Sequence, residues 1–275
     1  MITKGTRVTK GTKRFVFFVF FLVPFVLQQP PEGMALIPAG EFWQGRVYYT
    51  LIDELGMLAR ARMDDLPAHV VHVDAFYLDK YEATNSDYAR FVEATGHRKP
   101  FHWVGGKVPQ GQERFPVYNV SWDDANAYCG WAGKRLPTES EWEKAARGGT
   151  DRKRFPWGDQ LSASGGGRGS AGGAKAAHYG YPEGPVAAGS YPPNAYGVYD
   201  MVGNIAEWVA DWYGQNYYSI SPEKNPTGPA SGFYRVVRGN AWNGDDDRHL
   251  AVNYRNFSDP ATRTVTIGIR CAKTP

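Results

Sequence analysis

Side chains that could bind a ligand are concentrated in one polar stretch near the C-terminus, which reads WNGDDDRHLAVNYR. The candidate residues are Trp242, Asn243, Asp245, Asp247, Arg248, His249, Asn253, Tyr254 and Arg255. One interpretation is a polar cleft whose exposed face binds a ligand. A second is a solvated acidic loop, the usual role of a run such as Asp245–Asp247.

A metal centre is a third interpretation of this stretch. His249 with one of the neighbouring aspartates would supply part of a facial triad, although that site normally uses two histidines. His69 and His72 belong to a predicted strand, where side chains alternate between faces. They therefore point to opposite faces and cannot bind one metal together.

Three helices with clear end signals, and several strands, must position these residues. Thr84 is the predicted N-cap of a helix that runs to about Ala94, with Gly96 as its terminator. Ser121 caps a second helix that ends at Gly133, and Thr138 forms a capping box with Glu141 for a third that ends near Gly148. A short strand followed by a turn is predicted within 34–45, one strand over 69–78, a short amphipathic helix within 48–65, and a flexible Gly/Ala/Ser-rich loop over 162–177.

The first 33 residues have the composition of an export segment. Five basic residues accompany a run of thirteen apolar residues from Phe15 to Leu27, which has the length of a signal-peptide core. We therefore expect residues 1–33 to be a signal peptide or an N-terminal membrane anchor. Residues 34–275 would then form one exported domain that is periplasmic, secreted or membrane-anchored outside the cytoplasm.

The charge of the remaining chain argues against nucleic acid as a partner. The whole chain has a formal charge of +3, and residues 1–33 contain five basic residues and one acidic residue, so the rest carries −1. No basic stripe follows. The expected partner is an unidentified protein or small-molecule ligand.

Six ordered blocks after Met34 carry a family resemblance. They are IPAGEF at Ile37, DKYEATNSDYARFV at Asp79, WAGKRLPTESEWEKAARGG at Trp131, PWGD at Pro156, YPPNAYGVYDMVGNIAEWVADWY at Tyr191, and RVVRG with the closing GIRC. Together they resemble the formylglycine-generating enzyme, or sulfatase-modifying factor, family. The resemblance implies a single α+β domain related to C-type lectins and poor in regular secondary structure. The high content of glycine, proline and aromatic residues independently favours such a loop-rich fold.

The resemblance also implies a disulfide between Cys129 and Cys271, the only cysteines of the chain. One bridge that closes a very long loop suits an exported protein. Two buried free thiols are the alternative.

A structural calcium site is the next feature that the resemblance implies. The loop DMVGNIAE would supply side-chain oxygens from Asp200 and Glu207 and backbone carbonyls from Gly203 and Ile205, the hard ligands that calcium prefers. The alternative role for the two acids is to orient Trp208 and Trp212. A second calcium site of the family has no counterpart here, because the stretch around His178 is shortened.

The catalytic thiols of the family are absent. Formylglycine-generating enzymes hold copper with two cysteines beside a serine, but here Ala241 takes the serine position, Gly244 takes that of the first cysteine, and no residue supplies the second. Copper(I) depends on soft thiolate ligands, so we expect neither copper nor formylglycine generation.

Three classes of function remain for such a chain. The first, and the one we favour, is a ligand- or protein-binding accessory scaffold. The second is a non-thiol enzyme similar to the family members of pyoverdine maturation, so whether the chain is an enzyme stays open. The third is a binding protein diversified by a retroelement in its tail, Arg238 to Arg270.

Overall fold

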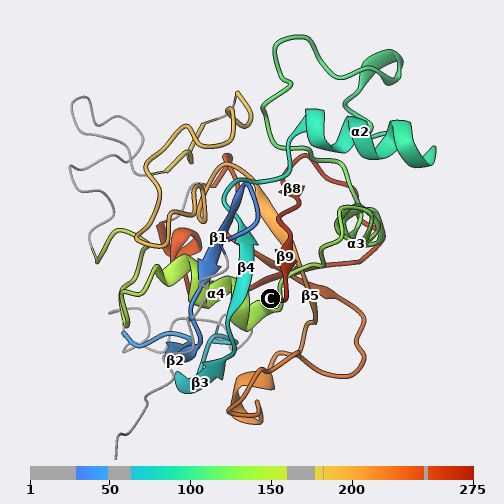
Figure 1. Ribbon diagram of the computed structural model, residues 1–275. Helices are drawn as coiled ribbons and strands as arrows, with labels where there is room; N and C mark the ends of the chain where they lie inside the picture. Colours follow the sequence, from blue (N-terminus) through green and yellow to red (C-terminus); the bar gives the residue numbers. More distant parts are fainter. Residues whose placement is uncertain (1–28, 49–62, 160–176, 182, 245–246) are drawn as a thin grey trace, which may run out of the picture.

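The computed structural model describes residues 29–48, 63–159, 177–181, 183–244 and 247–275 (Figure 1). Residues 1–28 of the expected export segment, most of the helix expected within 48–65 and nearly all of the glycine-rich loop therefore lie outside the described residues. Within the described part, no helix is long and apolar enough to cross a membrane.

Two small antiparallel sheets form one side of the domain. β1 (Met34–Ile37) pairs with β4 (Phe76–Asp79), which also pairs with β9 (Ala272–Lys273). β2 (Gly40–Gln44) pairs with β3 (His69–Val73). The first and last strands thus share β4 as their neighbour, which brings both ends of the domain together.

The predicted strand over 69–78 is in fact two strands, β3 and β4. The backbone N–H of Asp74 donates to Oδ1 of Asn225 at 2.9 Å rather than to a strand, and after Ala75 the chain changes sheets. The expectation of one continuous strand was wrong, because the run of β-forming residues does not reveal this change of partner.

A four-stranded sheet in the order β7-β6-β5-β8 forms the other side. Its strands are β5 (Ala206–Trp212), β6 (Arg235–Arg238), β7 (Asn256–Ser258) and β8 (Ile267–Gly268). β8 runs parallel to β5, and the other neighbours are antiparallel. Three 3₁₀ turns complete the described elements: η2 (Val104–Gly106), η3 (Tyr217–Ser219) and η4 (Asp247–Leu250).

The three predicted helices are all present with the predicted caps. They are α2 (Asn85–Thr95), α3 (Trp122–Trp131) and α4 (Glu139–Arg147). Thr84, Ser121 and Thr138 each form a complete capping box, and Gly96 and Gly148 end their helices in the left-handed conformation.

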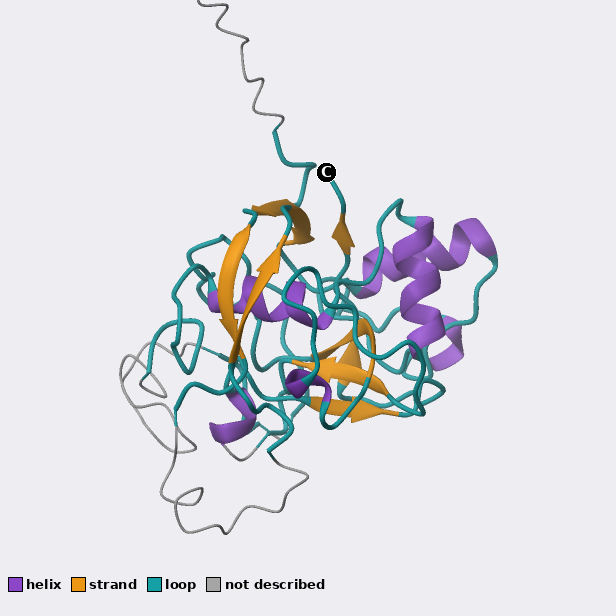
Figure 2. Ribbon diagram, turned by 90° about the horizontal axis from the view of Figure 1, so that it is seen from below, coloured by secondary structure: helices purple, strands orange, loops and turns teal. Residues whose placement is uncertain are grey.

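Helix α4 lies at the centre of the molecule, between the β2–β3 ladder and the four-stranded sheet, while α2 and α3 pack together at one edge (Figures 1 and 2). One core cluster surrounds Trp142 of α4, and a second joins Tyr88 and Cys129 to Trp208. This is the mixed, irregular α+β domain that the sequence predicted.

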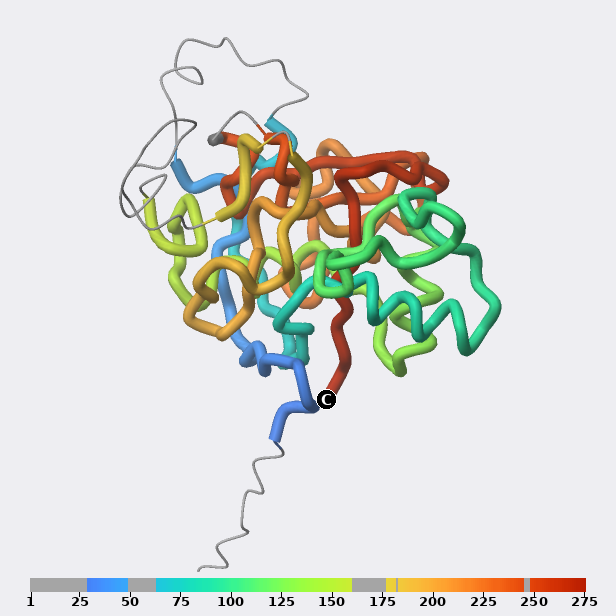
Figure 3. The backbone as a smooth tube through the Cα atoms, turned by 90° about the horizontal axis from the view of Figure 1, so that it is seen from above, coloured from blue at the N-terminus to red at the C-terminus, as the bar shows by residue number. Residues whose placement is uncertain are grey.

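The two ends of the described chain lie at one pole (Figure 3). The chain segments on either side of residues 49–62 lie at the opposite pole, drawn in blue and cyan. The chain directly after β6, which contains the candidate ligand stretch, also lies toward that opposite pole (Figure 3).

Candidate functional site

The candidate ligand stretch leaves β6 and is fastened to the loop that was predicted to bind calcium. Gly203 donates its backbone N–H to the carbonyl of Gly239 at 2.8 Å, and Trp242 donates to that of Asn204 at 2.9 Å. Asn204 and Gly239 both have positive φ angles, 54° and 93°. The two loops are therefore joined to each other by backbone hydrogen bonds.

Only part of the predicted ligand set is accessible. Asn243 is exposed, whereas Trp242, Arg248, His249 and Tyr254 are half-buried. The indole of Trp242 donates to the carbonyl of Val265 at 3.3 Å, and the rings of His249 and Tyr254 lie 4.6 Å apart. Asp245 and Asp246 lie outside the described residues, as does the side chain of Asp247, so the metal-triad hypothesis stays a prediction.

Asn253 and Arg255 have a different location from the one expected. Both are 3% exposed. The amide of Asn253 donates to Oδ2 of Asp65 at 2.8 Å, and Arg255 donates to both carboxylate oxygens of Glu139 at 2.7 and 2.9 Å. Neither side chain presents an open face to a ligand, because each is bonded inside the packed interior.

Arg255 belongs to a buried network of charges that extends along α4. Arg238 donates to Glu139 at 2.9 Å and to Glu143 at 2.8 Å, and Arg147 donates to Glu143 at 2.6 Å. Burial alone would raise the pKa of Glu139, but Arg255 and Arg238 hold it below its usual value. Both carboxylates, Glu139 and Glu143, are paired with arginines, so the network fixes α4 against β6 and the C-terminal segment.

The resemblance predicted that Ala241 and Gly244 take two catalytic positions of the family, and neither residue carries a reactive group. Ala241 is 2% exposed. At Gly244, an added Cβ would collide with Nδ2 of Asn240. A side chain at position 244 therefore requires the amide group of Asn240 to move.

The predicted disulfide is present. Cys129 of α3 and Cys271 beside β9 are bonded, with their Cα atoms 5.6 Å apart, and both residues are fully buried. Since the chain has only these two cysteines, no thiol is left for a copper site or for nucleophilic attack.

The predicted calcium ligands occupy a tightly turned, buried loop. Gly203 has a φ of 81°, and a Cβ there would lie 2.6 Å from the carbonyl oxygen of His178, so only glycine fits. Oδ2 of Asp200 accepts from the backbone N–H of Gly189 at 2.6 Å. Glu207 accepts from the indole of Trp142 at 2.6 Å and from Arg270 at 2.9 Å.

Burial disfavours the charged form of two carboxyl groups around this loop. Burial raises the pKa of Asp200 to about 6, and the nearby Glu207 acts in the same direction. Burial also raises the pKa of Glu82 well above its usual value, and Asp200 and Glu207 act in the same direction. Arg270 is the cation that faces them, and it is already paired with Glu207 at 2.7 Å. A cation bound at Asp200 would stabilise the charged carboxylate that burial disfavours.

The side chain of Glu207 fits the calcium role less well. Both of its oxygens already accept hydrogen bonds, and a cation beside it would lie close to the guanidinium of Arg270. Among the described residues, no group of three or more His, Cys, Asp or Glu residues could hold a metal ion. Calcium at Asp200, Gly203, Ile205 and Glu207 therefore remains a prediction.

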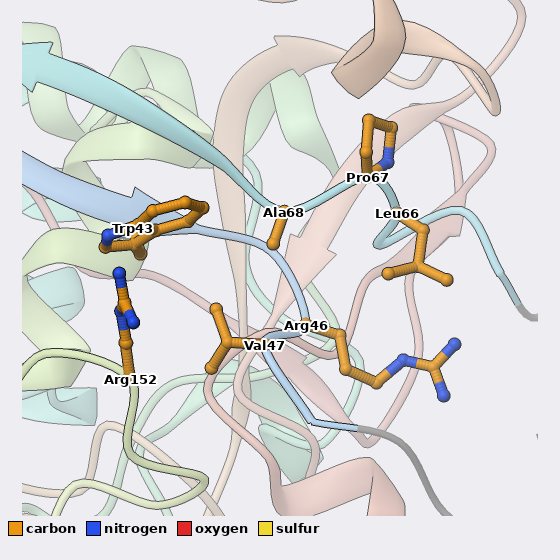
Figure 4. Close-up of a pocket in the computed structure, with 7 residues that line it drawn as sticks. All are labelled: Trp43, Arg46, Val47, Leu66, Pro67, Ala68 and Arg152. Atoms are coloured by element: carbon orange, nitrogen blue, oxygen red, sulfur yellow. The ribbon is translucent and has the colours of Figure 1, made fainter.

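Sequence reasoning missed a pocket of about 540 Å³ beside β2. It is lined by Trp43, Arg46, Val47, Leu66, Pro67, Ala68 and Arg152 (Figure 4). Trp43 gave a weak signal as an aromatic residue next to a turn. Nothing local to the sequence indicated that Arg152 would lie over it.

The fold and the two joined loops define a sulfatase-modifying-factor type of domain. A family model described as the sulfatase-modifying factor enzyme 1-like domain matches residues 22–275, and the chain belongs to this family.

Relatives of this chain include active and inactive proteins. The formylglycine-generating enzyme of Streptomyces coelicolor is 32% identical and is matched over 90% of this chain and 91% of that enzyme. The inactive Cα-formylglycine-generating enzyme 2 of Bos taurus is 38% identical over 75% of this chain and 79% of that protein.

A kinase also contains a region similar to this chain. The serine/threonine-protein kinase pkn1 of Chlamydia pneumoniae is 36% identical over 87% of this chain, but the match spans only 38% of the kinase.

Solved structures agree with the family assignment. PvdO from Pseudomonas aeruginosa has a TM-score of 0.70 and 28% identity, and the match covers 88% of this chain and 94% of PvdO. Variable protein 1 of Treponema denticola has a TM-score of 0.66 and 26% identity, with 88% and 95% covered.

Proposed function

We propose that this chain is a ligand- or protein-binding accessory member of the family that does not generate formylglycine. One observation carries the proposal: the chain has two cysteines, and both sulfur atoms are in the disulfide between Cys129 and Cys271. Thiolate chemistry needs a free, deprotonated sulfur. The similarity to a bovine protein named as inactive supports the same conclusion.

The test is a direct assay of cysteine oxidation. The purified chain is incubated with copper(I), oxygen and a cysteine-containing peptide substrate of formylglycine-generating enzymes, and the peptide mass is followed. The Streptomyces coelicolor enzyme is the positive control. We expect no conversion above that of copper alone. Conversion by this chain would overturn the proposal.

Export from the cytoplasm is the second part of the proposal. A disulfide persists mainly in oxidising compartments, and the basic and apolar composition of residues 1–27 is that of an export segment. The described chain begins at the pole that also holds the C-terminus (Figure 3). A membrane tether at that pole would leave the opposite pole facing away from the bilayer. Cell fractionation with a protease-accessibility assay tests this localisation.

A non-thiol enzyme is the alternative that the similarity to PvdO favours. Elemental analysis of the purified domain distinguishes the two. Stoichiometric iron or copper would support catalysis, whereas calcium alone would support a structural metal on a binding scaffold.

A diversified binding protein is the alternative favoured by the similarity to Treponema denticola variable protein 1. It would use the segment from Arg238 to Arg270 as its variable surface. A nearby reverse transcriptase gene and an imperfect repeat of the segment's coding sequence would support it, and the absence of both would exclude it.

A further inference from the structure

The pocket beside β2 has the size and lining of a small-molecule site. Its volume of about 540 Å³ lies within the usual range for such sites. Val47, Leu66, Pro67 and Ala68 supply an apolar surface, and Trp43 supplies an aromatic wall. Figure 4 shows Arg152 directed toward Trp43 at one end, while the side chain of Arg46 extends toward the other end.

The side chain of Asp151 fixes the backbone of Arg152 beside the pocket. Oδ1 of Asp151 accepts from the backbone N–H of Trp43 and from that of Arg152, both at 3.1 Å. Arg152 has a φ of 60°, which is uncommon for a residue other than glycine. Such conformations are concentrated at binding sites, where the surrounding structure holds them in place.

The charge of Arg152 is weakly balanced. Its guanidinium lies 4.5 Å from the ring centroid of Trp43, and its side chain is 60% exposed. The carboxylate of Asp151 is 4.0 Å away, at the limit of an ion pair and half-exposed. An exposed pair at this distance contributes little, so the guanidinium can pair with an incoming anion.

The other end of the pocket is electrically balanced. Arg46 is 7% exposed, and its Nε lies 3.3 Å from Oδ1 of Asp65. Asn253 donates to the second oxygen of Asp65. Asn253, expected from the sequence to touch a ligand, instead orients the carboxylate that pairs with Arg46. Of the two arginines that line the pocket, Arg152 is therefore the one whose nearest carboxylate is distant and half-exposed.

We propose that this pocket binds a small organic anion with an apolar body. The body packs on Val47, Leu66 and Pro67, and the acidic group pairs with the guanidinium of Arg152. This inference rests on the binding role proposed above and names the class of ligand for it.

The experiment uses a pair of fluorescent probes that differ in charge. 1-Anilinonaphthalene-8-sulfonate carries an apolar body and an anion, and N-phenyl-1-naphthylamine is its uncharged counterpart. Each probe is titrated into the purified wild-type chain and its variants, and each variant is first checked for an unchanged thermal unfolding transition. We expect one saturable site for the anionic probe.

The variants distinguish the effect of the charge of Arg152 on probe affinity from the effect of an arginine outside the pocket. Arg152→Gln is expected to weaken the anionic probe by about fivefold and to leave the neutral probe unchanged, and Arg152→Lys to restore most of the loss. The matched control is Arg90→Gln, which removes an arginine of similar exposure, 66%, that pairs with Asp87 on α2. It is expected to change neither affinity. Equal affinity of the anionic probe for the wild type and Arg152→Gln, or an equal loss in Arg90→Gln, would overturn the proposal.

The second measurement tests probe binding in a variant whose pocket is filled by a large side chain. Val47→Trp places a large side chain in the cavity and is expected to abolish saturable binding of both probes. Retained binding in that variant, or no saturable binding to the wild-type chain, contradicts this pocket as the site. Neither result affects the absence of formylglycine generation, which the peptide assay tests separately.

Discussion

Replacing Glu139 by glutamine tests whether Arg255 and Arg238 are structural residues. The Glu139 carboxylate accepts three hydrogen bonds, one from Arg238 at 2.9 Å and two from Arg255 at 2.7 and 2.9 Å. All three side chains are at most 3% exposed. Removal of one partner from a buried ion pair costs about 3–5 kcal/mol, because the remaining charges cannot reach water. We expect a loss of this size in the free energy of unfolding of Glu139→Gln.

The assay is urea unfolding at pH 7, followed by tryptophan fluorescence and circular dichroism. Glu141→Gln is the matched control on the same helix. Glu141 pairs with Arg135, whose side chain is 38% exposed, and a glutamine can keep the capping box with Thr138. This variant is expected to lose less stability than Glu139→Gln, because the half-exposed Arg135 remains in contact with water.

A double variant separates the ion pair from general damage to the core. Arg255→Met combined with Glu139→Gln is expected to lose less stability than the sum of the two single changes, because each single change leaves a partner unpaired. Equal losses for Glu139→Gln and Glu141→Gln, or strict additivity in the double variant, would refute the buried network.

Three further predictions concern the disulfide and the turned loop. Cys129→Ala with Cys271→Ala should lower the free energy of unfolding by up to about 5 kcal/mol in urea, because the bridge closes a loop of 142 residues in the unfolded chain; no difference from the wild type would contradict this. Gly203→Ala should lower the melting temperature by several degrees because of its φ of 81° and the adjacent carbonyl, and an unchanged melting temperature would be inconsistent with that turn. The pKa of Asp200 is raised from 3.8 to about 6, so its contribution to the free energy of unfolding is fully present below pH 3.8 and is lost as the pH rises through 6. Between pH 4 and 8, the calcium-free wild type should therefore lose on the order of 2 kcal/mol of this free energy relative to Asp200→Asn. Calcium at pH 8 should raise the melting temperature of the wild type but not of Asp200→Asn, and an equal response in both would remove Asp200 from the site.

Features with local causes could be predicted from the sequence. Thr84, Ser121 and Thr138 each cap a helix through a residue three positions later, so a short window contains the whole interaction. The disulfide was predictable from the family resemblance together with the presence of only two cysteines.

Features made by distant residues could not be predicted in the same way. Glu139 and Arg255 are 116 residues apart, and nothing near Arg255 indicates that its charge is buried and paired. At Arg255, a polar sequence therefore suggested contact with a ligand where the protein has a buried ion pair. The pocket beside β2 could not be predicted for the same reason, because the hydrogen bond between Trp43 and Asp151 joins positions 108 residues apart.

The central claim is that this chain has no free thiol, because both cysteines are in the disulfide. The most direct measurement is a count of reactive thiols in the full chain, expressed with export to an oxidising compartment, unfolded in denaturant without reductant and treated with an alkylating reagent. The account predicts no alkylation before reduction and two alkylated residues, Cys129 and Cys271, after it. Two alkylated residues before reduction would contradict it.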